Sequence, residues 1–104
     1  MREICLVRLD KTRPAVVLTR DGARGAMTKV TVAPVTRTIK GLSSEVPVGR
    51  RNGLHHDCVV SLDNVITVST DLLGRTVGHL DAAQEAQLAR AVVLAYDLDL
   101  PLLD

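Results

Sequence analysis

The sequence reads RPAVVL at residues 13–18 and VAPVT at residues 32–36, and these two stretches are its most informative feature. Each is a run of apolar, mostly branched residues, which is typical of a buried β-strand. One polar residue stands at an end of each run: Arg13 where the first begins and Thr36 where the second stops. If the strands pair, a permanent cation and a hydroxyl share one surface at the ends of rigid elements, where functional side chains are commonly presented.

Arg13 and Thr36 suit a ligand that gains negative charge during a reaction. A guanidinium keeps its proton, so it can bind the scissile phosphate of a phosphodiester and stabilise the pentavalent transition state. The Thr36 hydroxyl can donate a hydrogen bond to the same phosphate. The residues alone leave the alternatives open, because Arg13 also fits a charge at a strand edge and Thr36 an ordinary β-branched strand residue.

The remaining sequence predicts a mainly β protein. RPAVVL belongs to a strand that runs to Thr19, and VAPVT ends a central strand over residues 28–35, in which Pro34 indicates an edge or a bulge. Further strands are expected over residues 4–9, 44–48, 58–62, 65–68 and 77–80, and a helical turn over residues 71–73 is expected to end at Gly74.

One helix is expected at the end of the chain. Asp81 is its predicted N-cap, and residues 82–97 form the helix. One apolar face is formed by Leu88, Ala91, Val92 and Ala95, and residues 98–103 are apolar enough to pack back onto the domain. Many short strands with one terminal helix predict a small, strongly bent sheet or half-open barrel.

Length and composition indicate one domain over residues 1–104, with an adequate core because 46% of the residues are hydrophobic. We find no apolar run long enough to span a membrane and no signal-peptide pattern, so we expect a cytoplasmic protein. Cys5 and Cys58 do not make a disulfide framework, and we interpret them as reduced, half-buried thiols.

The charge pattern leaves two interpretations open. The net charge is only +1, yet seven cations lie between Arg20 and Arg51, while acidic residues gather in the last third. A basic half can meet a polyanion, and the same residues also fit solvated loops.

Aromatic residues are nearly absent: there is no Trp or Phe, and the one tyrosine is Tyr96. This argues against nucleic-acid binding by base stacking, so any such contact must use Arg, Lys, Ser, Thr and the backbone.

Other candidate chemistry is sparse. We find no metal-ligand spacing, no glycine-rich phosphate loop and no nucleophile elbow. Ser61 and Asp63 follow another apolar strand and can line the same groove, where Asp63 can accept a proton; Asp63 beside Asn64 is also an ordinary turn former. The adjacent His55 and His56 can move protons near neutral pH, or they are solvated loop side chains.

The ordered series of motifs resembles the MazF/PemK toxins of toxin–antitoxin systems, over Ile4 to Leu100. The segment from Gly41 to Pro47 (GLSSEVP) is similar to the mycobacterial branch. The motifs that carry the resemblance are RPAVV at 13–17, VAPVT at 32–36, EVP at 45–47, GL at 53–54, VVSLDN at 59–64 and LGRTVG at 73–78.

The resemblance implies an SH3-like, PemK-type β-barrel with a C-terminal helix that acts as a homodimer. It implies an endoribonuclease that needs no metal or cofactor, cleaves single-stranded RNA sequence-specifically by 2′-OH attack, leaves a 2′,3′-cyclic phosphate and a 5′-hydroxyl, and stops translation. A cognate acidic antitoxin is the implied partner. The family's catalytic Arg and Thr correspond to Arg13 and Thr36, and a contributing Asp corresponds to Asp63. We expect the RNA-binding residues to be Arg20, Arg37, Lys40, Ser61, His55 and His56.

The chain departs from the family pattern in two places. Only Asp10-Lys11-Thr12 stand where relatives have a longer loop before the Arg-Pro motif, so we expect a more open groove, and no general base can be assigned from that loop. Arg2 stands where a glycine usually precedes the acidic residue of the first strand.

Two other functions remain alternatives: a non-catalytic toxin on the same barrel that binds a protein such as DNA gyrase, and a plain nucleic-acid-binding module.

Overall fold

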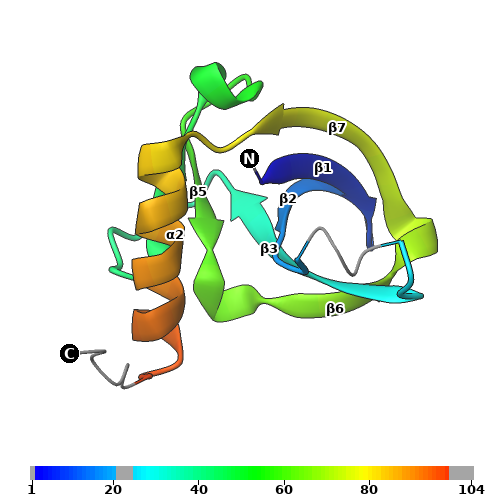
Figure 1. The fold of residues 1–104 in the computed structure, drawn as a ribbon. Coiled ribbons are helices and arrows are strands. Elements are labelled where there is room, and N and C mark those ends of the chain that lie inside the picture. Colours follow the sequence, from blue (N-terminus) through cyan, green and yellow to red (C-terminus); the bar gives the residue numbers. More distant parts are fainter. Residues whose placement is uncertain (1, 21–24, 99–104) are drawn as a thin grey trace.

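The computed structural model describes residues 2–20 and 25–98. In this part of the chain, seven antiparallel strands curl into a half-barrel and one helix packs along its open side (Figure 1). The elements, in chain order, are β1 (Glu3–Arg8), β2 (Thr12–Val17), β3 (Lys29–Thr36), β4 (Glu45–Val48), η1 (Arg50–Asn52), β5 (Cys58–Ser61), η2 (Leu62–Asn64), β6 (Ile66–Ser69), η3 (Thr70–Leu72), β7 (Leu73–His79) and α2 (Ala82–Ala95). The predicted bent sheet with a terminal helix is confirmed.

Strands β2 and β3 pair antiparallel at the centre of the sheet, whose order is β4-β5-β3-β2-β1-β7, with β6 also paired to β3. On its other side β3 pairs with β6 as far as Val32 and with β5 from Val35 onward. Pro34 lies in the interval between these two partners. The strand is therefore central, as predicted, and the residue that lacks an N–H donor stands where the neighbouring strand changes.

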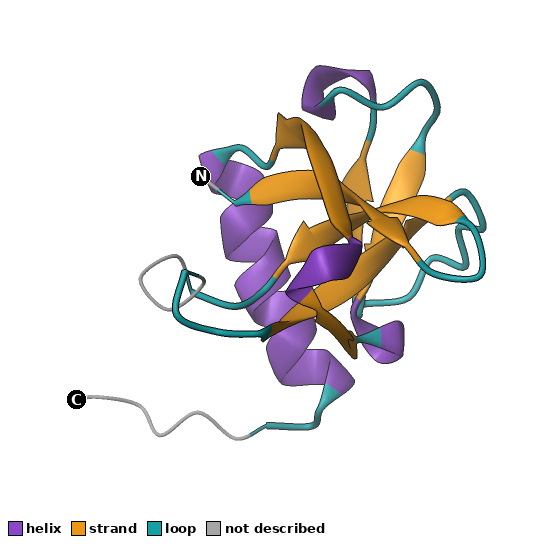
Figure 2. Ribbon diagram, turned by 90° about the vertical axis from the view of Figure 1, so that its right-hand side faces the viewer, coloured by secondary structure: helices purple, strands orange, loops and turns teal. Residues whose placement is uncertain are grey.

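The core consists of two apolar clusters on opposite sides of the sheet. One gathers residues of the β2–β3–β5 region with Leu80, Leu88 and Ala91, and thereby joins the sheet to α2. The other is enclosed by the curl of the sheet and contains Cys5 and Val7 among others. Figure 2, turned by 90°, shows the helix lying across one side of the crossed strands. The predicted apolar face of the helix is confirmed, with Val92 and Ala95 at its margin.

The helix begins and ends through local capping. The Asp81 carboxylate accepts the Gln84 N–H at 2.8 Å, and the Gln84 side chain accepts the Asp81 N–H at 3.0 Å, which forms the predicted N-terminal cap. The helix ends at Ala95, two residues earlier than predicted, because Asp97 adopts a left-handed φ of 52° and Leu98 N–H bonds back to the carbonyl of Val93. The predicted packing of the tail concerns residues that, beyond Leu98, lie outside the described part.

Strand β7 is longer than the sequence predicts. A 3-10 turn is present at Thr70–Leu72, but Gly74 does not end it in a loop, because the strand starts at Leu73 and continues to His79. Pairing with β1 along this length, with register shifts, stabilises the strand. A Cβ on Gly74 would lie 3.3 Å from the carbonyl oxygen of Leu6, so the glycine fits the close approach of the two strands.

A buried pair of amides joins the helix to the sheet. Asn52 and Gln84, 2% and 0% exposed, bond to each other in both directions, at 2.7 and 3.0 Å. Asn52 also donates to the carbonyl of His79, and Gln84 donates to the carbonyl of Pro47. Each polar atom of both amides has a partner, so this polar cluster is stable in the interior and fixes β4, η1, β7 and α2 relative to one another.

The turn after η1 touches β7 through two glycines. Gly53 has a φ of 85°, and a Cβ there would lie 2.0 Å from the carbonyl oxygen of Val77. A Cβ on Gly78 would lie 1.8 Å from the carbonyl oxygen of Asn52. Only backbone fits between these segments, so the glycines allow the loop that follows η1 to lie directly against β7.

The contact between the two backbones can be tested with Gly78→Ala. The added methyl group must displace backbone that the Asn52–Gln84 pair holds, so we expect the free energy of unfolding to fall by roughly 1–3 kcal/mol in chemical denaturation. Gly25→Ala is the matched control, because a Cβ at Gly25 meets nothing within 4 Å. Equal stability of the two variants would show that β7 and η1 are not held as described.

Candidate active site

Two grooves meet at Arg13 and Thr36. The larger, of about 690 Å³, lies between β2, β3, the loop that follows η1, and β7; the smaller, of about 420 Å³, lies between β3, the loop before β4, and the end of β5. Arg13, Val35, Thr36 and Thr38 line both grooves. The predicted cation and hydroxyl therefore lie together at the junction of one continuous depression.

Strand register brings Arg13 and Thr36 together. In the β2–β3 ladder, Ala15 pairs with Pro34 and Val16 with Ala33. Continuing this antiparallel register by two residues puts Arg13 opposite Thr36, and opposite residues in a sheet have Cβ atoms about 4.5–5.5 Å apart. The prediction that pairing places the two side chains on one surface is confirmed.

Arg13 is half-buried and has one acidic neighbour on its own hairpin. The Asp10 carboxylate approaches the Arg13 Nε at 3.8 Å, and the Asp10 side chain is 75% exposed. This pair is solvated and loosely held, so it contributes little stability and leaves the guanidinium able to bind an anion. Because β1 and β2 pair as far as Arg8 and Thr12, the connection between them is too short to cover the groove.

The Thr36 hydroxyl is oriented by its own backbone. Its oxygen accepts the N–H of Thr38 at 3.1 Å, which leaves the hydroxyl proton to be donated elsewhere. Thr36 is partly exposed and ends β3, after which residues 37–44 leave the sheet. This geometry suits the donation of a hydrogen bond to an oxygen bound in the groove.

Asp63, Ser61 and Lys40 line the smaller groove with Arg13 and Thr36. Asp63 is exposed and its Oδ2 accepts a hydrogen bond from the Ser44 hydroxyl. Ser61 is buried, 6% exposed, and its hydroxyl accepts a hydrogen bond from the Asn64 amide at 2.8 Å. The Glu45 carboxylate accepts the N–H groups at residues 40–42 and holds the loop that carries Lys40.

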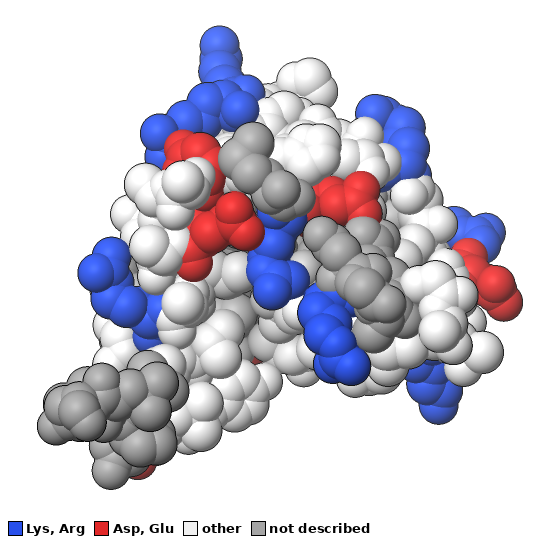
Figure 3. Space-filling model, in the orientation of Figure 1, with Lys and Arg blue, Asp and Glu red and all other residues white. Residues whose placement is uncertain are grey.

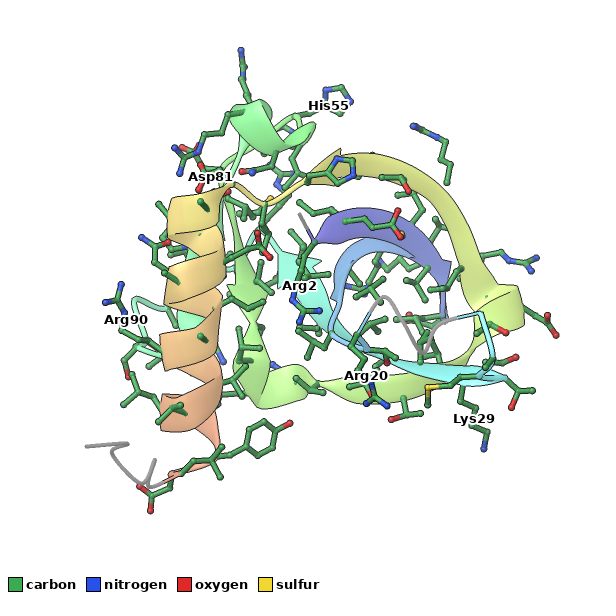
Figure 4. The ribbon with its side chains drawn as sticks, in the orientation of Figure 1. Arg2, Arg20, Lys29, His55, Asp81 and Arg90 are labelled. Atoms are coloured by element: carbon green, nitrogen blue, oxygen red, sulfur yellow. The ribbon has the colours of Figure 1, made fainter. Side chains whose placement is uncertain are left out.

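His55, His56 and Arg37 line the larger groove with Arg13 and Thr36. Both imidazoles are exposed and lie on the loop that the glycine contact fixes against β7. In Figure 4, His55 lies at the top of the molecule, near the N-terminus of the helix marked by Asp81. The structure thus brings together eight of the nine predicted site residues, divided between two joined grooves.

Arg20 is the exception among the predicted RNA-binding residues. It follows the far end of β2, whereas Arg13 stands at the beginning of the same strand, and it lines neither of the two grooves. Figure 4 shows Arg20 near β6, on the opposite side from His55. Arg20 is close in the sequence to the other cations, but the length of β2 separates Arg20 from the groove in space.

The predicted basic half is also dispersed in space. On the face drawn in Figure 3, Lys and Arg side chains are spread over the surface and alternate with Asp and Glu. The larger groove gathers positive charge locally, because Arg13, Arg37 and Arg75 line it. A local cationic groove, rather than a basic half, is therefore the surface that can meet a polyanion.

Cys58 lies in the larger groove, in surroundings that do not favour a nucleophilic thiolate. It is 7% exposed, and burial raises the pKa of its thiol above the ordinary value of 9.0; Arg37 lowers this pKa and Asp57 raises it further. A protonated thiol is a poor nucleophile. Cys5 is also buried, so both cysteines behave as small apolar residues and are more deeply buried than predicted.

Sequence reasoning missed Arg75, Asn64 and Asp10 as neighbours of the pair. Arg75 falls between a predicted helical turn and a predicted short strand, and only the full length of β7 brings it into the groove. The sequence marks Asn64 as part of a turn, yet Asn64 lines the smaller groove.

In the described residues, no group of three or more His, Cys, Asp or Glu side chains could hold a metal ion. No helix in this part of the chain could cross a membrane.

The sequence and the fold match those of known proteins. The chain is 50% identical over 99 residues to endoribonuclease MazF3 of Mycobacterium tuberculosis, which covers 95% of this chain and 96% of that protein. It is 36% identical to endoribonuclease MazF9 of the same organism, over 86% of this chain and 81% of that protein. The solved structure of the Mycobacterium tuberculosis toxin MazF-mt6 matches with a TM-score of 0.93 and 49% identity, over 95% of this chain and all of that chain.

The family model that matches the chain covers nearly all of the described fold. It describes PemK-like, MazF-like toxins of type II toxin–antitoxin systems, and it matches residues 2–96. This span includes Arg13, Thr36, both grooves and the terminal helix. The chain therefore belongs to the PemK-like, MazF-like toxins of type II toxin–antitoxin systems.

Proposed function

We propose that this toxin is a metal-independent endoribonuclease that cleaves single-stranded RNA at specific sequences and thereby stops translation. Relatives at 50% and 36% identity are endoribonucleases. The observation that carries the proposal is the position of Arg13 and Thr36 at the junction of the two grooves. A strand of RNA that follows both grooves would pass its backbone over this pair.

The proposed reaction is attack by a ribose 2′-oxygen on the adjacent phosphorus. The bond from the 2′-oxygen to phosphorus forms, the bond from phosphorus to the 5′-oxygen breaks, and a 2′,3′-cyclic phosphate and a 5′-hydroxyl result. Negative charge grows on the non-bridging oxygens, where the Arg13 guanidinium stabilises it. The Thr36 hydroxyl donates to the same phosphate and orients it for in-line attack.

Two proton transfers complete the reaction, one from the 2′-hydroxyl and one to the leaving 5′-oxygen. In an in-line displacement these two oxygens lie on opposite sides of phosphorus. Asp63 lies in the smaller groove, and the imidazoles of His55 and His56 lie in the larger, so proton-carrying groups flank the Arg13–Thr36 pair on both sides. We assign one transfer to Asp63 and the other to the histidines, and the direction of the bound RNA decides which group acts as base.

We further propose the partners of this toxin. Arg37 contacts a phosphate next to the scissile one in the larger groove. Lys40 and Ser61 contact the nucleotide in the smaller groove, and Arg20 contacts RNA that extends beyond it. The cationic larger groove also suits an acidic segment of a cognate antitoxin, which would compete with RNA there.

We also propose that the chain acts as a homodimer in the cytoplasm. Size-exclusion chromatography of the purified protein with light scattering can test the homodimer.

Cleavage of RNA in EDTA is the first test. We expect the purified protein to cut single-stranded RNA without added metal, and Arg13→Ala to lower kcat/KM by about 10²–10³-fold or more, as loss of a transition-state donor does in other enzymes. Arg90→Ala, on the exposed surface of α2, is the control. Absence of cleavage by the wild-type protein, or growth arrest with intact RNA, would point to a protein target instead.

Three variants of Thr36 test the role of its hydroxyl. Thr36→Ser keeps the donor, so most of the activity should remain, whereas Thr36→Ala and Thr36→Val should lower kcat with little change in KM. Single-turnover cleavage of a short RNA measures this step. If valine, which keeps the branched shape and the strand propensity, cleaves as fast as threonine, the hydroxyl has no catalytic role.

The proton-transfer assignment predicts unequal effects on the pH profile. Asp63→Asn should remove one limb of the profile of kcat/KM, and the double variant His55→Ala/His56→Ala should remove the other. Cleavage is followed across the pH range with each folded variant. An unchanged profile in either one would remove that group from the reaction.

Cys58 provides a check that excludes thiol chemistry. Cys58→Ala should keep wild-type cleavage, because the buried thiol is protonated near neutral pH. The folded protein holds this proton more tightly than the unfolded chain, so Cys58 should lower the stability progressively as the pH rises above 9.0. Denaturation of wild type and Cys58→Ala at neutral and alkaline pH measures this. A loss of cleavage in stably folded Cys58→Ala would contradict the assignment.

A further inference from the structure

We propose that the smaller groove holds the base of a nucleotide next to the scissile phosphate, and that Asn64 reads this base. The inference rests on the proposed function, because it requires RNA to be bound across Arg13 and Thr36. Asn64 stands at the end of η2 and lines the same groove as this pair.

The two grooves differ in charge. Among the described residues that line it, the larger groove has three arginines and no carboxylate. The smaller groove has two cations, Arg13 and Lys40, balanced by Glu45 and Asp63. A second phosphate would meet carboxylates in the smaller groove, whereas a neutral base would not be repelled there. The RNA backbone therefore suits the larger groove and a base suits the smaller.

The smaller groove has the size and walls that a base needs. Its volume of about 420 Å³ lies within the range of roughly 300–1,000 Å³ that is typical of small-molecule pockets. Pro34 and Leu42 provide apolar walls, and Leu42 is 47% exposed. The one aromatic residue of the chain, Tyr96, lies at the end of α2 and does not line this groove. A base in this groove must therefore be recognised by its edge rather than by aromatic stacking.

Asn64 is oriented for such recognition. Its Nδ2 donates to the hydroxyl of buried Ser61 at 2.8 Å, which anchors the amide. A primary amide has a second N–H and a carbonyl oxygen, so Asn64 still presents a donor and an acceptor side by side. This arrangement is used by asparagine to bind two adjacent groups on a base edge. The neighbouring Asp63 is held by Ser44, so both side chains have a fixed position before RNA binds.

The acceptors of this wall indicate the class of base. The Asn64 carbonyl and the Asp63 carboxylate both accept hydrogen bonds, and an exocyclic amino group supplies two donors. Adenine, cytosine and guanine carry such a group, whereas uracil has a single ring N–H. We therefore expect an amine-bearing base in the groove and discrimination against uridine at that one position.

The test compares cut sites in a pool of randomised single-stranded RNA, sequenced after cleavage by wild type, Asn64→Ala and Asn64→Asp. Gln87→Ala, an exposed amide on α2, is the matched control. We expect both Asn64 variants to lose preference at one position beside the cut, by about 5- to 150-fold, which is the discrimination of a paired base contact. Preferences at the other positions, and those of Gln87→Ala, should remain as in the wild type.

A second measurement isolates the amino group. A substrate with that base is compared with one in which only the exocyclic amine is removed, using 2-pyrimidinone for cytosine or purine for adenine. Removal should slow wild-type cleavage and have little effect on Asn64→Ala. The inference is overturned if Asn64 variants keep every wild-type preference, if amine removal slows both proteins equally, or if folded Asn64→Ala cleaves no RNA. Failure of the wild type to cleave any RNA would instead refute the proposed function.

Discussion

The pairing register of β2 with β3 is the constraint on which the site depends. It pairs Ala15 with Pro34, and so brings Arg13 and Thr36 to the same end of two strands in a sheet that is apolar on both sides. A shift of one residue would exchange the side chains that fill the two clusters and would also separate the guanidinium from the hydroxyl. Core packing and the geometry of the site therefore depend on the same hydrogen-bonded ladder.

The second wall of the larger groove depends on a different interaction. The buried Asn52–Gln84 pair fixes the start of α2 against η1 and β7, and the glycines at 53 and 78 let the backbones touch. The loop with His55 and His56 continues directly from this contact. The terminal helix, which does not line the larger groove, thus helps to fix the loop that brings two imidazoles into it.

Electrostatics divides the depression into two parts. Three arginines line the larger groove, whereas two carboxylates offset two cations in the smaller. The junction at Arg13 and Thr36 is where a polyanionic backbone and a neutral base can both be accommodated. The short β1–β2 hairpin leaves this junction open, and it places only Asp10 near Arg13. The low net charge of +1 therefore does not prevent the binding of a polyanion, because the electrostatic field in the groove is set by the residues that line it.

Local patterns in the sequence determined most of the strands, the cap at Asp81, the apolar face of α2 and the candidate pair Arg13 and Thr36. These features depend on residues that are close in the chain, where propensity and periodicity are strong signals. Tertiary structure alone decided the length of β7, which requires β1 as partner, and the early end of the helix at the left-handed Asp97. It also decided that Arg75 and Asn64 join the grooves and that Arg20 does not. The physical reason is that a groove forms between segments distant in sequence, so its lining depends on strand pairing and on a buried amide pair that no local pattern encodes.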